Sequence, residues 1–421
     1  MSFNSKLINS ILFGIGVLGI SQYANATDGY FSQGYGVKSQ SMGGVGIALP
    51  QDSLAAASNP AGLALIGDRI DLGLTWFRPE REATLSNTGG HFSDGTFNGN
   101  GRDNFLIPEA GLNKLITPDI TLGVSIYGNG GMNTSYKGGI PLLNGGNGES
   151  SGIDYIQLFV APTVAWKVTP SQNIGASVIL GYQRFKATGI NNFTGISASP
   201  KNVTDVGTDD ALGIGLHLGW IGQITDTVSL GATVQSKTYF QKFDKYKGLF
   251  AGSGEMDAPA TIGFGVAFKA IPQVTLAADV QRIFYSDVNA IGNSGSSQGK
   301  LGSSSGPGFG WKDVNVYKLG VSYDVNNSLT LRAGYNHTDQ PITGSEALFN
   351  VLAPAVVQDH LTLGTTYKLP DNKGEISIAY VHAFDNSVNG QNAIPASFGG
   401  GNVKLKMYQD SLGIAYGWNF D

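Results

Sequence analysis

The chain has 421 residues, of which only 14% are charged, and a formal net charge of −5 at pH 7. Soluble domains carry about 25% charged residues, so a soluble protein with this composition would have a poorly solvated surface. The mild acidity excludes a basic nucleic-acid-binding face, and we expect no nucleic-acid partner. Cysteine is absent and glycine is abundant, with 61 residues. This excludes a disulfide-stapled fold and suits bent strands.

The first 26 residues have the layout of a secretory signal peptide. Lys6 is the only charge before the apolar run Ile11–Ile20, and Ala24-Asn25-Ala26 supplies a small-x-small cleavage site. A membrane-anchoring helix is the alternative, but the run is far shorter than the roughly 20 residues that such a helix needs. We expect cleavage after Ala26.

Residues 27–69 lack the pattern of a strand and are rich in Gly, Ala and Ser. Their leucines and Ile66 need burial, so we expect a compact hatch that plugs the lumen of the domain formed by residues 70–421. An exposed periplasmic extension is the alternative. Within the segment, Asn59, Pro60 and Gly62 belong to an Asn-Pro turn. We expect this turn to shape the hatch and hold it against the wall, without Asn59 contacting a ligand.

From residue 70 onward, apolar residues alternate with small or polar residues, a pattern that sends the two sets to opposite faces of a strand. Near the C-terminus, for example, Leu412, Ile414, Tyr416 and Trp418 alternate with smaller residues. The fourteen predicted strands are Ile70–Leu85, Phe105–Leu115, Ile120–Tyr136, Tyr155–Val168, Ile174–Thr188, Ala211–Ile224, Val228–Phe243, Ala258–Ala270, Val274–Tyr285, Val314–Tyr323, Leu329–His337, His360–Leu369, Ile376–Phe384 and Val403–Phe420.

Tight turns alternate with long Gly/Ser/Asn-rich loops between these strands. Thr117-Pro118-Asp119 and Ile271-Pro272 are such turns, whereas Ala290–Gly310 and Asn386–Gly401 are long loops. Short periplasmic turns and long outer loops are typical of bacterial outer-membrane barrels. The sequence therefore predicts an all-β fold, a transmembrane 14-stranded antiparallel β-barrel with an N-terminal hatch inside the lumen. A soluble secreted β-sandwich is the alternative, but it gives no reason for the alternation of loop lengths.

Three glycines, Gly128, Gly130 and Gly131, lie within the third predicted strand. Glycine inside a strand weakens pairing and marks bulges or bends, so we expect a kink here. The alternative is a simple bend near the loop end of the strand.

Aromatic residues and lysines are interleaved where the seventh strand passes into an outer loop. Rings could hold an apolar tail while an ammonium group meets a carboxylate. Alternatively, the segment is an interfacial aromatic girdle, with its lysines facing lipopolysaccharide phosphates. The candidate ligand-binding residues are Tyr239, Phe240, Lys242, Phe243, Lys245, Tyr246, Lys247, Leu249 and Phe250.

Enzymatic activity is not expected. The five histidines are scattered, and no nucleophile elbow, metal-ligand spacing or phosphate-binding motif is present. Ser377 and His382 are close in sequence, but their odd spacing places them on opposite faces of a strand. We expect no catalytic residue, no metal and no cofactor.

Several segments together resemble the long-chain fatty acid transporter (FadL/TodX) family of outer-membrane proteins. They are Asn59–Gly62, Tyr127–Tyr136, Tyr239–Phe250, Asp257–Ala260 and Gln358–Thr362. The resemblance spans the mature chain and implies a monomeric barrel in the Gram-negative outer membrane, in contact with lipid and lipopolysaccharide. It also implies passive inward movement of hydrophobic small molecules, either fatty acids or hydrocarbons.

The same resemblance implies that the kink opens a side window in the wall. It further implies that a first ligand-capture site involves the candidate loop and the loop near residues 190–209. A general porin for polar solutes and a structural or adhesive surface barrel remain as alternatives. The porin would need an open, charged pore, and the adhesive barrel would need neither plug nor window.

Overall fold

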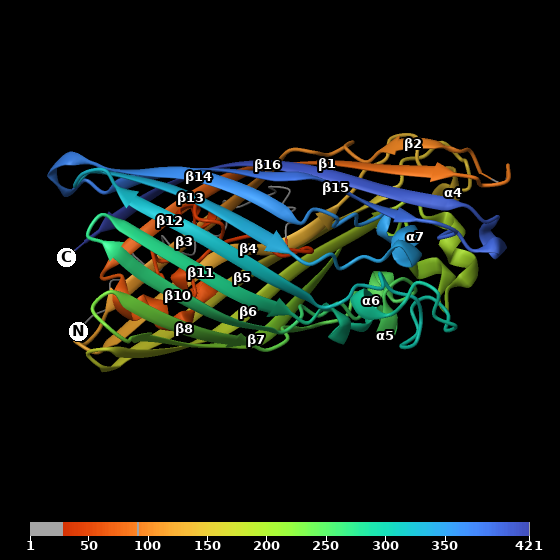
Figure 1. The fold of residues 1–421 in the computed structure, drawn as a ribbon. Coiled ribbons are helices and arrows are strands. Elements are labelled where there is room, and N and C mark those ends of the chain that lie inside the picture. The colour runs from red at the N-terminus through yellow and green to blue at the C-terminus, as the bar shows by residue number, and fades with distance from the viewer. Residues whose placement is uncertain (1–27, 91, 421) are drawn as a thin grey trace.

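The computed structural model describes residues 28–90 and 92–420, so the predicted signal peptide lies outside the described residues. Fourteen antiparallel strands form a closed ring, because β16 (Asn402–Asn419) pairs along its whole length with β1 (Arg69–Ser86). Each barrel strand pairs with its neighbours in sequence, and the strands are strongly tilted (Figure 1). The prediction of a closed 14-stranded antiparallel barrel is confirmed.

The remaining barrel strands follow in chain order, and two short strands, β2 and β9, add to β1 and β7. They are β2 (Gly95–Asn98), β3 (Phe105–Leu115), β4 (Ile120–Asn133), β5 (Gly152–Thr169), β6 (Gln172–Thr188), β7 (Asp209–Gln223), β8 (Val228–Gln235), β9 (Tyr239–Phe240), β10 (Thr261–Ile271), β11 (Val274–Ile283), β12 (Val314–Asp324), β13 (Leu329–Thr338), β14 (Asp359–Lys368) and β15 (Glu375–Gly390). Among the described residues, no helix is long and apolar enough to cross a membrane.

Short helices lie in the hatch and in the loops. They are α2 (Val37–Gln40), α3 (Ala55–Ser58), η1 (Pro60–Leu65), α4 (Pro141–Asn144), η2 (Asn191–Ile196), η3 (Pro200–Asn202), η4 (Asp244–Tyr246), α5 (Ala251–Gly254), η5 (Tyr285–Asp287), α6 (Asn289–Gly292), η6 (Gly344–Glu346), α7 (Ala347–Asn350), η7 (Pro370–Asn372) and η8 (Ala396–Phe398). Tight turns lie at the barrel end where β16 finishes, whereas α4 to α7 lie at the opposite end (Figure 1).

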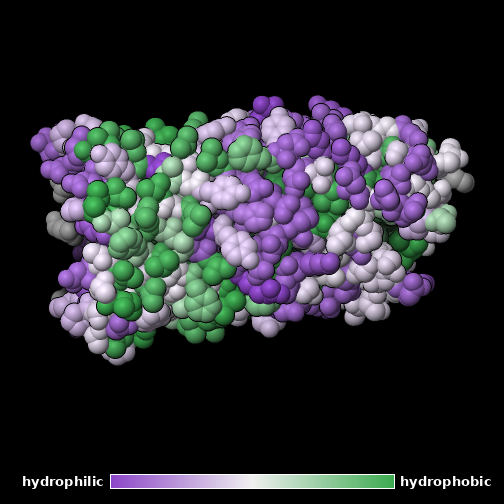
Figure 2. Space-filling view, in the orientation of Figure 1, coloured by the Kyte–Doolittle hydropathy of each residue, from purple (hydrophilic) through white to green (hydrophobic). Residues whose placement is uncertain are grey.

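The apolar residues that alternate along each strand form the outer face of the barrel. On β16, Leu412, Ile414, Tyr416 and Trp418 are exposed, as expected for side chains that meet lipid. An apolar band covers the end of the barrel with the tight turns, and hydrophilic side chains cover the middle of the view (Figure 2). The membrane-facing band therefore occupies only part of the height of the wall.

The predicted strand Val228–Phe243 was too long. The chain leaves the β8 ladder after Gln235, and Tyr239–Phe240 then pairs with β7 as the separate strand β9. The ring of Phe240 lies where a Cβ on Gly213 would come within 2.6 Å of it. This glycine leaves room for the Phe240 ring against β7.

The predicted strand Ile376–Phe384 was too short. β15 continues to Gly390 across a register shift between Ala383 and Asn386, so the following loop covers only residues 391–401. This upper part of the strand lies beyond the apolar band. There the sequence lacks the apolar-polar alternation that marks a lipid-facing strand.

Residues 28–68 lie inside the ring of strands. Backbone groups of this segment bond to side chains of strands on several sides of the barrel, including Glu109 of β3, Asp279 of β11 and Thr362 of β14. The segment is drawn in red inside the barrel, near the end with the tight turns (Figure 1). We refer to residues 28–68 as the hatch.

Candidate functional site

Buried carboxylates on the barrel wall hold the hatch. Glu109 accepts bonds from the backbone N–H groups of Gly36 and Val37, at 3.1 and 3.0 Å. Asp279 accepts from Gly46 and Ile47, at 2.7 and 3.0 Å. Four backbone N–H groups of the hatch thus find buried acceptors on β3 and β11, and leaving them unpaired would cost free energy, so these strand residues fix the middle of the hatch.

The predicted turn at Asn59 lies against the wall formed by β6 and β7. The Asn59 side-chain amide donates to the carbonyl oxygens of Ile47, at 2.8 Å, and Trp220, at 3.0 Å. A Cβ on Gly219 would lie only 1.8 Å from Asn59 Oδ1, so this glycine permits the close approach. Pro60 and Gly62 are buried beside it.

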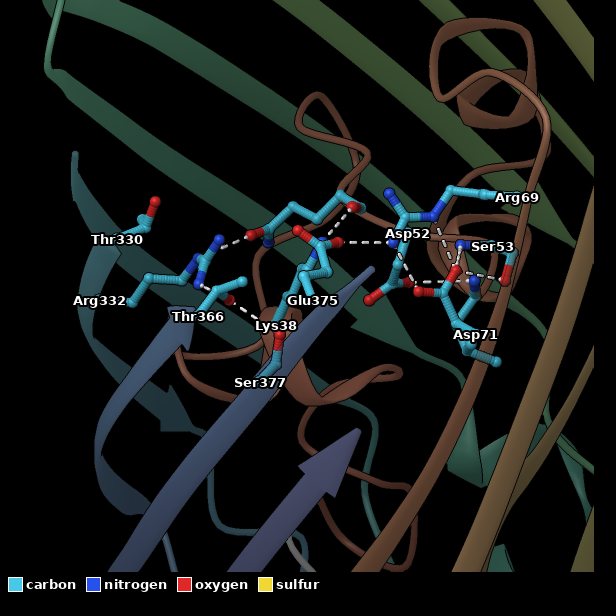
Figure 3. Close-up of polar contacts among 12 residues, drawn as sticks. Lys38, Asp52, Ser53, Arg69, Asp71, Thr330, Arg332, Thr366, Glu375 and Ser377 are labelled. Atoms are coloured by element: carbon cyan, nitrogen blue, oxygen red, sulfur yellow. Dashed lines mark hydrogen bonds and ion pairs between the residues drawn. The ribbon is translucent and has the colours of Figure 1, made fainter. Parts of the chain in front are cut away.

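A charged network joins the hatch to β1 and β15 (Figure 3). Lys38 forms an ion pair with Glu375, which also binds Arg69 at 2.8 Å. Asp71 accepts from both the backbone and the hydroxyl of Ser53, at 2.8 and 2.6 Å. This buried network fixes a second part of the hatch because each charge has an opposite charge or hydrogen-bond donor beside it.

The ladder between β3 and β4 is interrupted. In the described part of the chain, their pairing runs from Leu115–Thr121 up to Ala110–Ile126 and stops there. Above that point β4 no longer pairs with β3 but keeps its pairing with β5, with a register shift between Gly128 and Gly130, where the glycines predict a kink. A bridge between Asn100 and Ser135 joins the two sides again farther up. We call this interval the β3–β4 gap.

The first residues of the hatch cover the gap from inside. Ser32 donates its backbone N–H to the Asn129 carbonyl at 2.9 Å, and Gly131 donates to the Tyr30 carbonyl at 3.0 Å. A Cβ on Gly130 would lie 1.9 Å from the Tyr30 oxygen. Segment 28–32 therefore pairs with the kink like a short extra strand, and only a glycine at position 130 allows this contact.

Asp28 lies in the lumen beside β12 and β13. Thr338 donates to its carboxylate at 2.7 Å, and Lys318 Nζ lies 3.7 Å from it. Lys318 also donates to the Gln33 carbonyl at 2.9 Å. Burial raises the pKa of Asp28, although the nearby Lys318 opposes the shift. The start of the hatch thus carries a carboxylate that meets a buried lysine.

Aromatic rings connect the outer loops with the gap. Phe185 lies 5.8, 4.7 and 4.6 Å from the rings of Phe243, Tyr246 and Phe250, measured between centroids. The series continues inward from Phe185 to Tyr155 at 6.4 Å, and from Tyr155 to Tyr30 at 5.8 Å. Tyr30 also packs near Tyr285 and Trp311, at 5.4 and 6.1 Å. We call this series the aromatic path.

The candidate ligand-binding residues separate into two groups. The rings of Phe240, Phe243, Tyr246 and Phe250 are buried and Leu249 is partly buried, whereas Tyr239 is 62% exposed on the outer face. The three lysines are exposed. Lys242 Nζ donates to the Gly252 carbonyl at 2.7 Å, and Lys245 Nζ donates to that of Thr208. The structure therefore does not bring the lysines together with the buried rings.

Sequence reasoning missed Lys318, Tyr285 and Trp311. Lys318 could have been found, because Tyr317 and Leu319 point to lipid and the alternation places Lys318 on the lumen side. Its partner Asp28 lies 290 positions away in sequence, and no local pattern predicts such a pair. Ser377 and His382 lie on opposite faces of β15, where they bind Thr366 and Asp410 respectively.

A family model described as "Outer membrane protein transport protein (OMPP1/FadL/TodX)" matches residues 23–421. The toluene transporter TodX of Pseudomonas putida is 20% identical over 92% of this chain and 99% of that chain, with a TM-score of 0.69. A FadL homologue of Pseudomonas aeruginosa is 15% identical over 93% and 100%, with a TM-score of 0.72.

The toluene transporter TbuX of Ralstonia pickettii is 21% identical over 92% of this chain and 99% of that chain, with a TM-score of 0.65. No curated protein matches the sequence significantly. At these identities the structural likeness establishes the fold, a closed barrel shared across nearly the full length. Since the family model spans almost all of the residues as well, the chain belongs to the OMPP1/FadL/TodX family of outer-membrane transport proteins.

Proposed function

We propose that this chain takes up hydrophobic compounds across the outer membrane, passively and by handover between binding sites. The observation that carries the proposal is the aromatic path, which runs from Phe243 and Phe250 to Tyr30 at the β3–β4 gap. An apolar molecule loses contact with water at each step along such a path. Two similar structures are named toluene transporters, in agreement with an aromatic route.

Release is proposed to occur sideways through the β3–β4 gap. A molecule that left there would reach the hydrocarbon of the membrane directly. Straight passage would instead lead it past the buried charges of Lys38, Glu375 and Arg69, which an apolar molecule cannot satisfy. The hatch would serve as the plug, with segment 28–32 as the part that moves away from the kink.

The Asp28–Lys318 pair favours an acid among the ligands. In the resting chain the Asp28 carboxylate lies against Lys318 and Thr338. A fatty acid that displaced segment 28–32 would bring its own carboxylate to the same ammonium group. A neutral hydrocarbon would leave this buried charge without its partner, at a free-energy cost.

Uptake by cells that lack their own hydrophobic-compound transporters tests the function. Cells that express this chain should take up labelled oleate or toluene, and a Gly130→Val/Gly131→Val variant should take up far less. Valine favours regular strand pairing, and a side chain at position 130 would meet the Tyr30 carbonyl at 1.9 Å. Expression and capture at the cell surface should not change.

The matched control is Gly95→Val on β2, where a Cβ would meet only the Phe97 ring at 3.9 Å. This variant should take up both compounds normally. Normal uptake by the double valine variant would contradict release at the kink. Liposome swelling distinguishes the porin alternative, since rapid sugar influx through the unmodified protein would contradict the proposed function altogether.

A further inference from the structure

The loop between β13 and β14 folds into the barrel rather than over its rim. Residues 347–357, which include α7, are all buried. The tip, Val351–Val357, has the sequence VLAPAVV and carries no charge. An outer loop with this composition must pack against an apolar surface inside the protein. We call residues 339–358 the inner loop.

The tip of the inner loop is held from two sides inside the barrel. On the side where the loop begins, Asn386 and Gln340 donate to the Val356 carbonyl at 2.8 and 2.9 Å. On the far side, Thr134 and Tyr136 donate their hydroxyls to the carbonyls of Leu352 and Val351, both at 2.8 Å. Thr134 follows directly on β4, which lies six strands from β13 in a ring of fourteen. Asn386, on β15, lies four strands from β4, so the tip connects two separate parts of the wall.

The inner loop also lies between the outer loops and the start of the hatch. The ring of Phe349 stacks on Phe193 of the β6–β7 loop, with centroids 5.0 Å apart. Trp311 donates its indole N–H to Asn350 at 2.6 Å and packs 6.1 Å from Tyr30. Phe349 and Asn350, directly before the tip, thus cover two rings of the lumen, one of which packs near Tyr30.

The anchors of the tip flank the upper border of the β3–β4 gap. Ser135, between Thr134 and Tyr136, donates to the Gly99 carbonyl at 2.9 Å and accepts from Gly101 at 2.8 Å. These bonds join the two sides of the wall above the gap. Release of the tip from Thr134 and Tyr136 would thus act on the same short segment that closes the gap from above.

We propose that residues 349–357 of the inner loop, which include the tip, cover a binding surface for apolar ligands formed by Tyr136, Phe193 and Trp311, and leave it when a ligand arrives. The ligand class is an uncharged chain or ring, because it replaces an uncharged peptide and gains the same burial. This proposal rests on the proposed function but names a separate site, away from the aromatic path residues Phe243 and Phe250.

Thiol labelling tests the proposal. The chain has no cysteine, so Ala353→Cys, at a position that is 3% exposed, introduces the only thiol. A water-soluble maleimide should label it slowly in the purified full-length protein and about tenfold faster or more with saturating toluene. Ser345→Cys, at an exposed position of the same loop, should be labelled rapidly with or without toluene.

Adding Tyr136→Phe and Thr134→Val to Ala353→Cys should raise the toluene-free labelling rate by about tenfold, because two hydrogen bonds of the closed state are lost. Tyr182→Phe removes a hydroxyl that bonds to Asp210 at the outer surface and should leave the rate unchanged. Hydrogen exchange of amides 351–357 in the unmodified protein gives a second measurement, with lower protection expected in toluene.

An unchanged labelling rate and unchanged protection in toluene, in protein that takes up toluene in cells, would overturn the proposal. Failure of the proposed function itself would be recognised differently, because the unmodified chain would then take up neither toluene nor oleate. The effect of the Tyr136→Phe and Thr134→Val substitutions does not depend on a ligand. Its absence would by itself contradict the role of these two anchors.

Discussion

The side chains of the outer loop form two groups, buried rings and exposed lysines, whose proposed roles can be tested separately. Phe243 and Phe250 pack on Phe185 inside the wall, whereas Lys242, Lys245 and Lys247 are exposed. Ring burial does not distinguish head groups. Phe243→Ala and Phe250→Ala should therefore weaken binding of toluene and of a fatty acid alike, by about tenfold or more. Equilibrium binding to detergent-extracted protein measures this.

The lysines are tested by replacing all three with Gln. If an ammonium group meets the carboxylate, fatty-acid binding should weaken by about ten- to hundredfold while toluene binding stays the same. Lys300→Gln with Lys312→Gln, which are exposed lysines of the β11–β12 loop, is the matched control. Unchanged binding of both ligands would indicate that the lysines face lipopolysaccharide instead. Equal loss of both would indicate a collapsed loop.

The hatch as an element should respond to pH through Asp52. Burial, together with the neighbouring Asp71, raises the pKa of Asp52 to about 6, although Lys38 and Arg69 oppose this shift. The pKa of an unfolded-state carboxyl is about 4. The contribution of Asp52 to hatch stability is therefore complete below about 4 and is lost as pH rises through about 6.

Hydrogen exchange of the hatch amides, corrected for the intrinsic rate, should accordingly show less protection at pH 8 than at pH 5. Asp52→Asn should reduce this difference, because the amide keeps the shape of the side chain without its charge. The buried carboxyl groups of Glu109 and Asp279, which also bond to hatch amides, account for the remainder. Asp94→Asn, in the outer β1–β3 loop, should leave the difference in place. Equal hatch protection at both pH values in the unmodified protein would contradict the role of Asp52.

Elements with a lipid-facing side could be predicted from sequence, and others could not. All fourteen barrel strands coincide with predicted segments because the apolar band imposes alternation on them. The upper part of β15, Asn386–Gly390, was missed because it lies outside this band. The three glycines of β4 predict weakened pairing. The β3–β4 gap itself and the pairing of segment 28–32 with Gly130 could not be predicted, because both depend on contacts between segments that are far apart in sequence.

The whole molecule has two obstructions in series, the hatch and the inner loop. Deleting residues 27–68 behind an intact signal peptide should leave a barrel that still inserts, because the β16–β1 closure does not involve the hatch. Conductance in planar bilayers should rise. Replacing residues 351–357 with a Gly/Ser linker in the deleted protein should raise it further. Conductance that stays low in both variants would contradict the plug interpretation.

The height of the barrel wall determines how far the outer loops stand from the lipid. β16 has 18 residues, which span roughly 60 Å at 3.3 Å per residue and about 45 Å of height at the usual barrel tilt. The apolar band of such barrels is about 25 Å tall. On β16 it ends near Leu412, and Lys404, Lys406 and Asp410 follow above it. The outer loops therefore stand clear of the lipid by about 20 Å, within or beyond the hydrated sugar layer. Hydrophobic molecules diffuse poorly through such a layer, so under the proposed function a tall wall would let them pass it inside protein.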